Sequence, residues 1–284
     1  MKSLLATLAF ACFATTAHGQ TLTPADAEAR TQTKQISAVR VILVGDSTTA
    51  VQSGWGSAFC ADHLTSFAAC INLARGGRSS FSYRAEGSWD IALAEIKSGG
   101  YAKTWVLIQF GHNDQPGKPG RSTDLKTEFP AFIRQYVSEA RAAGAIPLLV
   151  TPLTRRSFRD GQLDDDLAPW AAATRQVAAD MNVPLVDLHA RSRDVVQALG
   201  PLQAMALAQV PPPPEVVAAA GTGTTIAAAK PPAAPPTPAF DQMAFAKQAF
   251  DYTHLGKTGA DLISGLVSEE LAQKVPDLRP YIIP

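Results

Sequence analysis

The stretch that decides the fold runs from Val39 to Ser47 and reads VRVILVGDS. Apolar residues fill it almost without interruption up to Val44, and the turn Gly45-Asp46-Ser47 follows at once. A nearly continuous apolar run is typical of a strand that is covered on both faces, as in a parallel sheet. Because ligands bind beyond the carboxyl ends of parallel strands, Ser47 lies where a functional residue is expected.

The same type of run recurs along the chain. Four further runs rich in Val, Ile and Leu follow the first, and helix-compatible segments separate most of them. The runs are Val39 to Val44, Cys70 to Leu73, Thr104 to Phe110, Ile146 to Thr151 and Val183 to Leu188, and the segments are Trp55 to Leu64, Ser88 to Lys97, Leu125 to Ala143 and Ala168 to Met181. Strands that alternate with helices predict a doubly wound α/β sheet.

Length and charge limit the class of protein. A chain of 284 residues is long enough for one large domain, or two small ones, with a proper hydrophobic core. Lysine plus arginine and aspartate plus glutamate both number 25, so the formal net charge is zero. This balance argues against a nucleic-acid partner, because nucleic-acid-binding proteins usually carry a basic excess.

Residues 1–20 have the pattern of a secretory signal peptide. Lys2 gives a positive start, Leu4 to Phe13 a short apolar stretch, and Ala17-His18-Gly19 a small-x-small cleavage pattern. A membrane anchor is the alternative, but the apolar run is shorter than the ~20 residues that span a bilayer. We therefore expect a secreted or periplasmic protein with no membrane association after signal removal.

The remaining chain reads as a leader, residues 21–37, and one domain, residues 38–284. Within that domain, Val210 to Pro238 consists mostly of Pro, Ala, Thr, Val and Gly and includes Pro211 to Pro214. Such a composition offers little to bury, so it predicts an inserted mobile or polyproline-like loop. A functional lid is the alternative interpretation.

Cys60 and Cys70 are the only cysteines that remain after signal removal. An oxidising compartment favours a disulfide between them. Two buried free thiols are the alternative.

Residues suited to nucleophilic catalysis follow the predicted strands. Gly45-Asp46-Ser47-Thr48 follows the first strand, and Asp251-Tyr252-Thr253-His254 comes just before the last predicted helix. A serine hydroxyl needs a base, and the base needs an orienting acid. If the turn is helical, Asp251 and His254 share a face, so they can supply both groups to Ser47.

Two further loops offer groups that stabilise negative charge. Ala74-Arg75-Gly76-Gly77-Arg78-Ser79 follows the second strand, and Gly111-His112-Asn113-Asp114 follows the third. The backbone N–H groups of Ser47 and Gly77 and the side-chain amide of Asn113 are the predicted oxyanion hole. We interpret His112 as a hydrogen-bonded loop residue and Asp164 to Asp166 as a solvated loop, and we expect no metal and no cofactor.

These residues resemble the SGNH (GDSL) hydrolase superfamily. Its four signature residues would fall on Ser47, Gly77, Asn113 and His254, with the triad acid on Asp251. The chain is further similar to the rhamnogalacturonan acetylesterase-like branch, over roughly Val39 to Gln273 apart from the insertion. The matching features are Gly54-Trp55-Gly56, Gly77-Arg78-Ser79, Ser82-Tyr83, Glu86-Gly87, Trp89, Phe110-Gly111-His112-Asn113-Asp114, Thr151-Pro152, Arg155-Arg156 and Asp251-Tyr252-Thr253-His254.

The resemblance implies a flavodoxin-like three-layer α/β/α fold with a five-stranded parallel sheet. It also implies a serine esterase that removes acetyl groups from pectin or xylan without a metal. A lipase or thioesterase of the same superfamily is one alternative, although the insertion is poor in the Leu, Ile and Phe that a lipid lid would need. An inactive carbohydrate-binding protein is another, although no catalytic group is missing.

Six residues are candidates for contact with the polysaccharide. Trp55, Tyr83 and Trp89 offer flat rings for sugars, with core packing as the alternative. The arginines follow predicted strands two and four, and an arginine fork pairs well with carboxylates. They are Arg78, Arg155 and Arg156. This charge suits pectin, which carries galacturonate, and xylan, which can carry glucuronate, better than a neutral lipid. The resemblance adds the preference for a pectic substrate, with acetylated xylan second.

Overall fold

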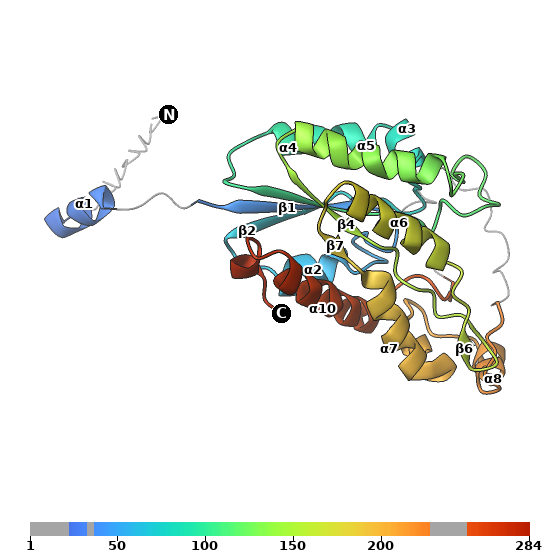
Figure 1. Cartoon of the computed structure of the whole chain (residues 1–284). Helices are drawn as coiled ribbons and strands as arrows, with labels where there is room; N and C mark the ends of the chain where they lie inside the picture. Colours follow the sequence, from blue (N-terminus) through green and yellow to red (C-terminus); the bar gives the residue numbers. More distant parts are fainter. Residues whose placement is uncertain (1–22, 33–36, 228–248) are drawn as a thin grey trace, which may run out of the picture. The chain divides into compact units, whose positions relative to one another are not determined.

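The computed structural model describes residues 23–32, 37–227 and 249–284 (Figure 1). The chain forms two units, Met1–Ile36 and Ser37–Pro284. In the first unit, the described part is helix α1 (Pro24–Thr31), none of whose residues is buried. Thr23 and Asp26 cap its start by accepting each other's backbone N–H. The predicted signal peptide lies outside the described residues.

The second unit is built on a five-stranded parallel sheet, which confirms the predicted fold class. The strand order is β2-β1-β3-β4-β7. The strands are β1 (Val39–Gly45), β2 (Ala68–Asn72), β3 (Thr104–Gln109), β4 (Ile146–Val150) and β7 (Leu185–Val186). In the register, Val41 of β1 faces Cys70 on one side and Trp105 on the other. The strand order reverses at β1, so the gap between β1 and β3 is the expected place for a ligand.

Helices cover both faces of this sheet (Figure 1). One face carries α2 (Gly56–Asp62), α7 (Leu188–Gln203) and α10 (Lys257–Lys274), and the other carries α3 (Ser82–Ala85), α4 (Ser88–Lys97), α5 (Glu128–Ala142) and α6 (Ala168–Asp180). Alternate residues of β1 enter two separate cores, Val41 and Leu43 on the first face and Ile42 and Val44 on the second. All four are fully buried. A buried side chain of this size stabilises the fold by about 1.5–3 kcal/mol, so the continuous apolar run holds three layers together.

The predicted mobile loop between Val210 and Pro238 is wrong for its first part. Residues Pro214–Ala220 form helix α8, which begins on a proline and contains Glu215 and three alanines, all good helix formers. Val216 and Ala220 are buried against Met205 and Phe250. Beyond residue 227, the rest of the predicted insertion lies outside the described residues.

The chain just after α8 is also attached to the domain. Thr225 donates its backbone N–H to the carbonyl of Phe158 and accepts the Phe158 N–H on its hydroxyl, at 2.9 and 2.8 Å. Phe158 belongs to a small antiparallel hairpin of β5 (Phe158–Arg159) and β6 (Gln162–Leu163). The described part of this unit also contains the 3₁₀ helices η1 (Ala204–Leu207) and η2 (Arg279–Tyr281). Of the helices in the described ranges, none has the length and apolar content needed to cross a bilayer.

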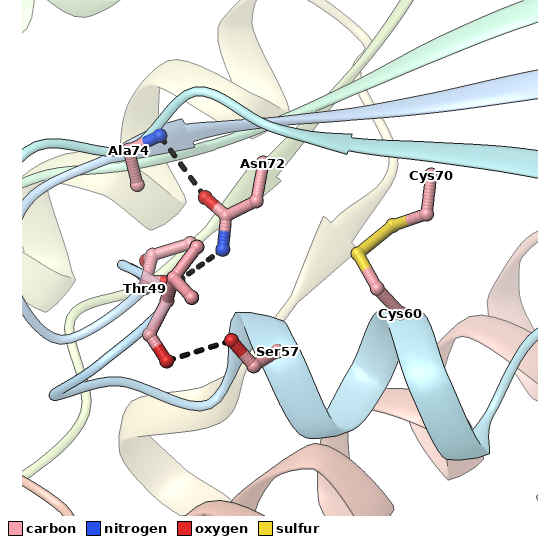
Figure 2. The surroundings of a disulfide bond; sticks show 7 residues. Thr49, Ser57, Cys60, Cys70, Asn72 and Ala74 are labelled. Carbon is pink, nitrogen blue, oxygen red and sulfur yellow. Dashed lines mark hydrogen bonds between the residues drawn. A yellow bond between two sulfur atoms is a disulfide. The ribbon is translucent and has the colours of Figure 1, made fainter.

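A disulfide joins Cys60 of α2 to Cys70 of β2, with 5.5 Å between the two Cα atoms (Figure 2). Figure 2 also shows how the end of β2 is held. The Asn72 amide donates to the carbonyl of Thr49 at 2.9 Å, and its oxygen accepts the N–H of Ala74 at 3.0 Å. The edge strand is therefore tied both to α2 and to the turn that follows β1.

Candidate active site

The turn after β1 is shaped by the side chain of Asp46. Its Oδ1 accepts the backbone N–H of Thr48 at 2.8 Å and the Thr48 hydroxyl at 2.7 Å. Burial opposes ionisation of Asp46, but the nearby His112 and the two bonds from Thr48 outweigh it and lower its pKa. The turn presents Ser47 at the carboxyl end of β1, with 8% of the residue exposed.

Ser47, His254 and Asp251 form one hydrogen-bonded row. His254 Nε2 lies 2.9 Å from Ser47 Oγ, and His254 Nδ1 lies 2.6 Å from Asp251 Oδ2. The other oxygen of Asp251 accepts the backbone N–H groups of Thr253 and His254, each at 2.7 Å. Burial opposes ionisation of Asp251, but these bonds outweigh it and lower its pKa to about 2. The carboxylate is therefore charged at neutral pH and fixes the orientation of the ring.

The turn that carries Asp251 and His254 is not helical. It is an Asx-type turn in which the Asp251 side chain takes the place of a backbone acceptor. The expected side-by-side arrangement of the two residues is found, but a carboxylate that bonds its own chain produces it.

The buried guanidinium of Arg156 stabilises the turn that carries Asp251 and His254. Arg156 Nη2 donates to the carbonyls of Asp251 and His254 at 3.0 and 2.9 Å. Burial lowers the pKa of Arg156 to about 10, so the side chain stays charged at neutral pH. The residue is 1% exposed. The prediction that Arg156 contacts substrate is wrong, because its donors are directed at the backbone of the triad turn.

The loops with the predicted oxyanion-hole residues follow β2 and β3, the two neighbours of β1. Gly77 has a φ of +78°, a conformation that favours glycine. Its neighbour Gly76 lies against Ser47, since a Cβ there would be 3.6 Å from Ser47 Cβ. Asn113 Nδ2 donates to the carbonyl of Arg78 at 3.1 Å, which links the two loops.

Arg121, which sequence reasoning missed, fixes both loops. Its Nη1 lies 3.2 Å from the carbonyl of Gly77 and 3.4 Å from Asn113 Oδ1. The second contact orients the Asn113 amide, because the oxygen then faces the guanidinium and the NH₂ group faces away from it. Nothing in the local sequence singles out this arginine, which lies later in the connection between β3 and α5, beyond Gly111 to Asp114.

Asp114 ties the same two loops together beneath the site. This buried carboxyl accepts the backbone N–H of Ser80 at 3.0 Å and the hydroxyls of Ser80 and Thr123. The Tyr136 hydroxyl of α5 donates to the carbonyl of Ser80 at 2.7 Å. Burial raises the pKa of Asp114 to about 7, although the bonds from Ser80 and Thr123 oppose the rise.

The prediction that Trp55, Tyr83 and Trp89 stack on sugar rings is wrong. All three are at most 1% exposed, so core packing, the alternative interpretation, is correct. Their polar ends are bonded inside the fold. Trp55 Nε1 donates to Gln109, the Tyr83 hydroxyl to the carbonyl of Leu73, and Trp89 Nε1 to Glu139.

The other two predicted arginines lie partly exposed and paired with acids. Arg78 Nε donates to both carboxylate oxygens of Glu86 at 3.0 and 2.8 Å. Arg155 Nη1 donates to Asp166 at 2.8 Å, and its Nε donates to the Thr253 hydroxyl at 3.2 Å. Arg155 therefore lies beside the triad turn.

His112 is not the hydrogen-bonded loop residue that we expected. It is buried, and neither ring nitrogen has a hydrogen-bond partner among the described residues. Its Nδ1 lies 3.6 Å from Asp46 Oδ2, and burial lowers its pKa despite that carboxylate. Within residues 23–32, 37–227 and 249–284, no three His, Cys, Asp or Glu side chains are grouped so that they could hold a metal ion.

A hydroxyl, an imidazole and a carboxylate aligned at the carboxyl edge of a doubly wound sheet are the parts of a serine hydrolase site. Residues 43–209 match the GDSL-like Lipase/Acylhydrolase family. The chain belongs to this family and is a carboxylic ester hydrolase. The matched range includes Ser47, Gly77 and Asn113 but ends before Asp251 and His254, which the hydrogen bonds described above place beside Ser47.

Two similar proteins come from Bacillus subtilis strain 168. The Probable rhamnogalacturonan acetylesterase YesY is 37% identical over 159 residues, which are 54% of this chain and 71% of that protein. Rhamnogalacturonan acetylesterase RhgT is 35% identical over 178 residues, 60% of this chain and 73% of that protein. The crystal structure of protein YxiM from the same species shares the fold, with a TM-score of 0.59 at 20% identity over 84% of this chain and 57% of that one.

Proposed function

We propose that this protein removes O-acetyl groups from acetylated plant cell-wall polysaccharide, with rhamnogalacturonan preferred over xylan. The observation that carries the proposal is the unbroken row of hydrogen bonds from Asp251 through His254 to Ser47. Two relatives that bear the name rhamnogalacturonan acetylesterase support the choice of polymer.

The first half of the reaction transfers the acetyl group to the enzyme. Ser47 Oγ attacks the acetyl carbonyl carbon while His254 Nε2 takes the hydroxyl proton, and Asp251 stabilises the imidazolium that forms. The carbonyl oxygen becomes negative, and the N–H groups of Ser47 and Gly77 and the Asn113 amide donate to it. When the intermediate collapses, the bond to the sugar oxygen breaks, and His254 returns the proton to that oxygen.

The second half releases acetate. A water molecule takes the place of the sugar hydroxyl, and His254 removes its proton as the water attacks the acetyl-Ser47 carbonyl. The same donors stabilise the second negative oxygen. Cleavage of the acyl bond then gives acetic acid, which ionises to acetate, and restores the hydroxyl of Ser47 for the next cycle.

The proposed place of action is outside the cytoplasm. The signal-peptide pattern of residues 1–20 supports export. Export suits the substrate, because a cell-wall polymer is too large to be imported before it is degraded.

The test compares acetate release by the wild-type enzyme and by Ser47→Ala. We expect release from acetylated rhamnogalacturonan and loss of turnover on the order of a million-fold in the variant, with an unchanged unfolding midpoint. Ser57→Ala is the matched control, because Ser57 of α2 donates only to the carbonyl of Val51 and should not affect the reaction. Substantial activity in Ser47→Ala would contradict the mechanism. Faster turnover of a long-chain acyl ester than of either acetylated polymer would contradict the substrate.

A further inference from the structure

Lys118 and Arg121 are presented by one short turn between β3 and α5. The carbonyl of Lys118 accepts the backbone N–H groups of Arg121 and Ser122 at 3.0 and 2.9 Å. The N–H of Lys118 in turn donates to the Ser122 hydroxyl at 2.9 Å. These bonds fix the backbone of the turn. The side chains of Lys118 and Arg121 therefore start from the same rigid segment.

Arg121 and Arg155 contact two different loops of the candidate site. Arg121 bonds the carbonyl of Gly77, within the loop that carries a predicted oxyanion donor. Arg155 bonds the hydroxyl of Thr253, the residue before His254. Both guanidinium groups are therefore fixed to loops that carry residues of the candidate site.

The cations in this region outnumber the acids that pair with them. Asp166 pairs with Arg155. Neither Arg121 nor Lys118 has an ion-pair partner within the described part of the chain. Partial burial and the positive charges of Arg155 and Arg121 lower the pKa of Lys118, and the negative charges of Asp166 and Asp46 only partly oppose this. Like charges held together in this way are stabilised by a bound anion.

We propose that Lys118, Arg121 and Arg155 bind the carboxylate of an acidic sugar unit while the acetyl ester lies at Ser47. This subsite rests on the proposed function and specifies its substrate as a uronate-containing polymer. Guanidinium groups bind carboxylates through paired N–H donors, and the ammonium adds a mobile charge. A neutral sugar would gain nothing from these groups, so the subsite favours acidic chains.

Neighbouring cations do not share this role. Glu86 neutralises Arg78 through the Nε of its guanidinium. Arg156 is buried and donates to the backbone of the triad turn. Arg155 is more fully engaged, because Gln115 Oε1 accepts from its Nη1 and Nη2 at 3.2 and 3.0 Å in addition to the bonds to Asp166 and Thr253. The carboxylate subsite is therefore centred on the turn at Lys118 and Arg121, and Arg155 adds its charge and the second N–H of Nη2.

The test uses two matched substrates, an acetylated rhamnogalacturonan oligosaccharide with free carboxylates and the same oligosaccharide with its carboxyl groups methyl-esterified. The readout is the ratio of the two kcat/KM values for acetate release. We expect the wild-type enzyme to prefer the free acid by about tenfold, the size of one charge-assisted hydrogen bond. The preference should shrink as salt rises, because salt screens exposed charges.

Single-residue variants test whether the proposed subsite causes the preference for the free acid. Lys118→Met should reduce the ratio several-fold, and Lys118→Arg should keep it because the charge remains. Lys97→Met is the matched control, since this exposed lysine ends α4 near the opposite edge of the sheet. Equal reduction of the ratio in Lys97→Met and Lys118→Met would overturn the subsite in favour of a general effect of net charge.

The wild-type result separates the two proposals. Acetate release at equal kcat/KM from the free acid and the methyl ester would overturn the subsite and leave the acetylesterase function in place. Absence of acetate release from both oligosaccharides would overturn the proposed function itself.

Discussion

Replacement of Arg156 by methionine should distort the turn that carries Asp251 and His254. It should remove no contact with the substrate. Methionine keeps most of the apolar stem but removes the guanidinium, which donates to the carbonyls of Asp251 and His254. A third contact, to the carbonyl of Thr253, is 3.4 Å long and adds little. The substitution therefore removes two good hydrogen bonds from a charged donor.

The size of the effect follows from these bonds and from burial. Each bond from a charged donor contributes about 1.5–3 kcal/mol. Removal of a cation that is 1% exposed also relieves an unfavourable desolvation, which offsets part of that loss. The expected net loss of stability is about 2–4 kcal/mol. Because the freed turn carries His254, a shift of the ring by about 1 Å should lower kcat roughly hundredfold, with little change in KM.

The assay combines steady-state kinetics on a small acetyl ester with urea unfolding of the same preparations. Arg156→Lys should be intermediate, since one ammonium cannot reproduce the planar fork that reaches two carbonyls. Arg159→Met is the control, because the Arg159 side chain is 76% exposed and lies only three residues away. Wild-type kcat together with wild-type stability in Arg156→Met would refute the role assigned to this arginine.

Three further predictions concern other parts of the site and the fold. Asn113→Ala should lower kcat by roughly a hundred- to a thousand-fold with a much smaller change in KM, because the oxyanion forms only after attack; a loss confined to KM would instead mark Asn113 as a ground-state contact. Replacement of both Cys60 and Cys70 by alanine should cost about 2–3 kcal/mol of unfolding free energy, since the bond closes a loop with a sequence separation of 10; two titratable thiols in the unreduced, denatured wild-type protein would contradict this. The pKa of Asp114 is raised to about 7, so the folded protein retains a proton that the unfolded chain loses near pH 4. Stability should therefore fall by up to about 1.4 kcal/mol per pH unit as pH rises from roughly 4 to 7, and Asp114→Asn should flatten that slope in urea midpoints measured across this range.

The sequence predicted the elements that depend on local pattern. The apolar run of β1 and its turn drew attention to Ser47, and Asp251 and His254 were paired because they lie three positions apart. Contacts between distant residues have no local signal. The bond from Arg156 to Asp251 spans 95 positions, and the one from Arg121 to Gly77 spans 44.

The predictions for α8 and for Trp55 were wrong because they relied on composition and on position in the sequence, whereas packing decides both. The segment around α8 has few large apolar residues, but its alanines favour a helix, and Val216 and Ala220 anchor that helix in a small core. Trp55 lies close to the nucleophile in sequence, but it faces the sheet and not the solvent. Proximity to a catalytic residue along the chain does not decide which way a ring points.

The hydrogen bond between Ser47 and His254 joins residues that are 207 positions apart. At about 5–20 residues per second, the ribosome adds His254 roughly 10–40 s after Ser47. Helix α10, which directly follows His254, packs on α2, the first helix after Ser47. The nascent chain therefore carries a serine without its proposed base until His254 is made and α10 docks on α2. The geometry of the site delays hydrolytic competence until the domain is nearly complete, so the chain gains esterase activity late in its own synthesis and folding.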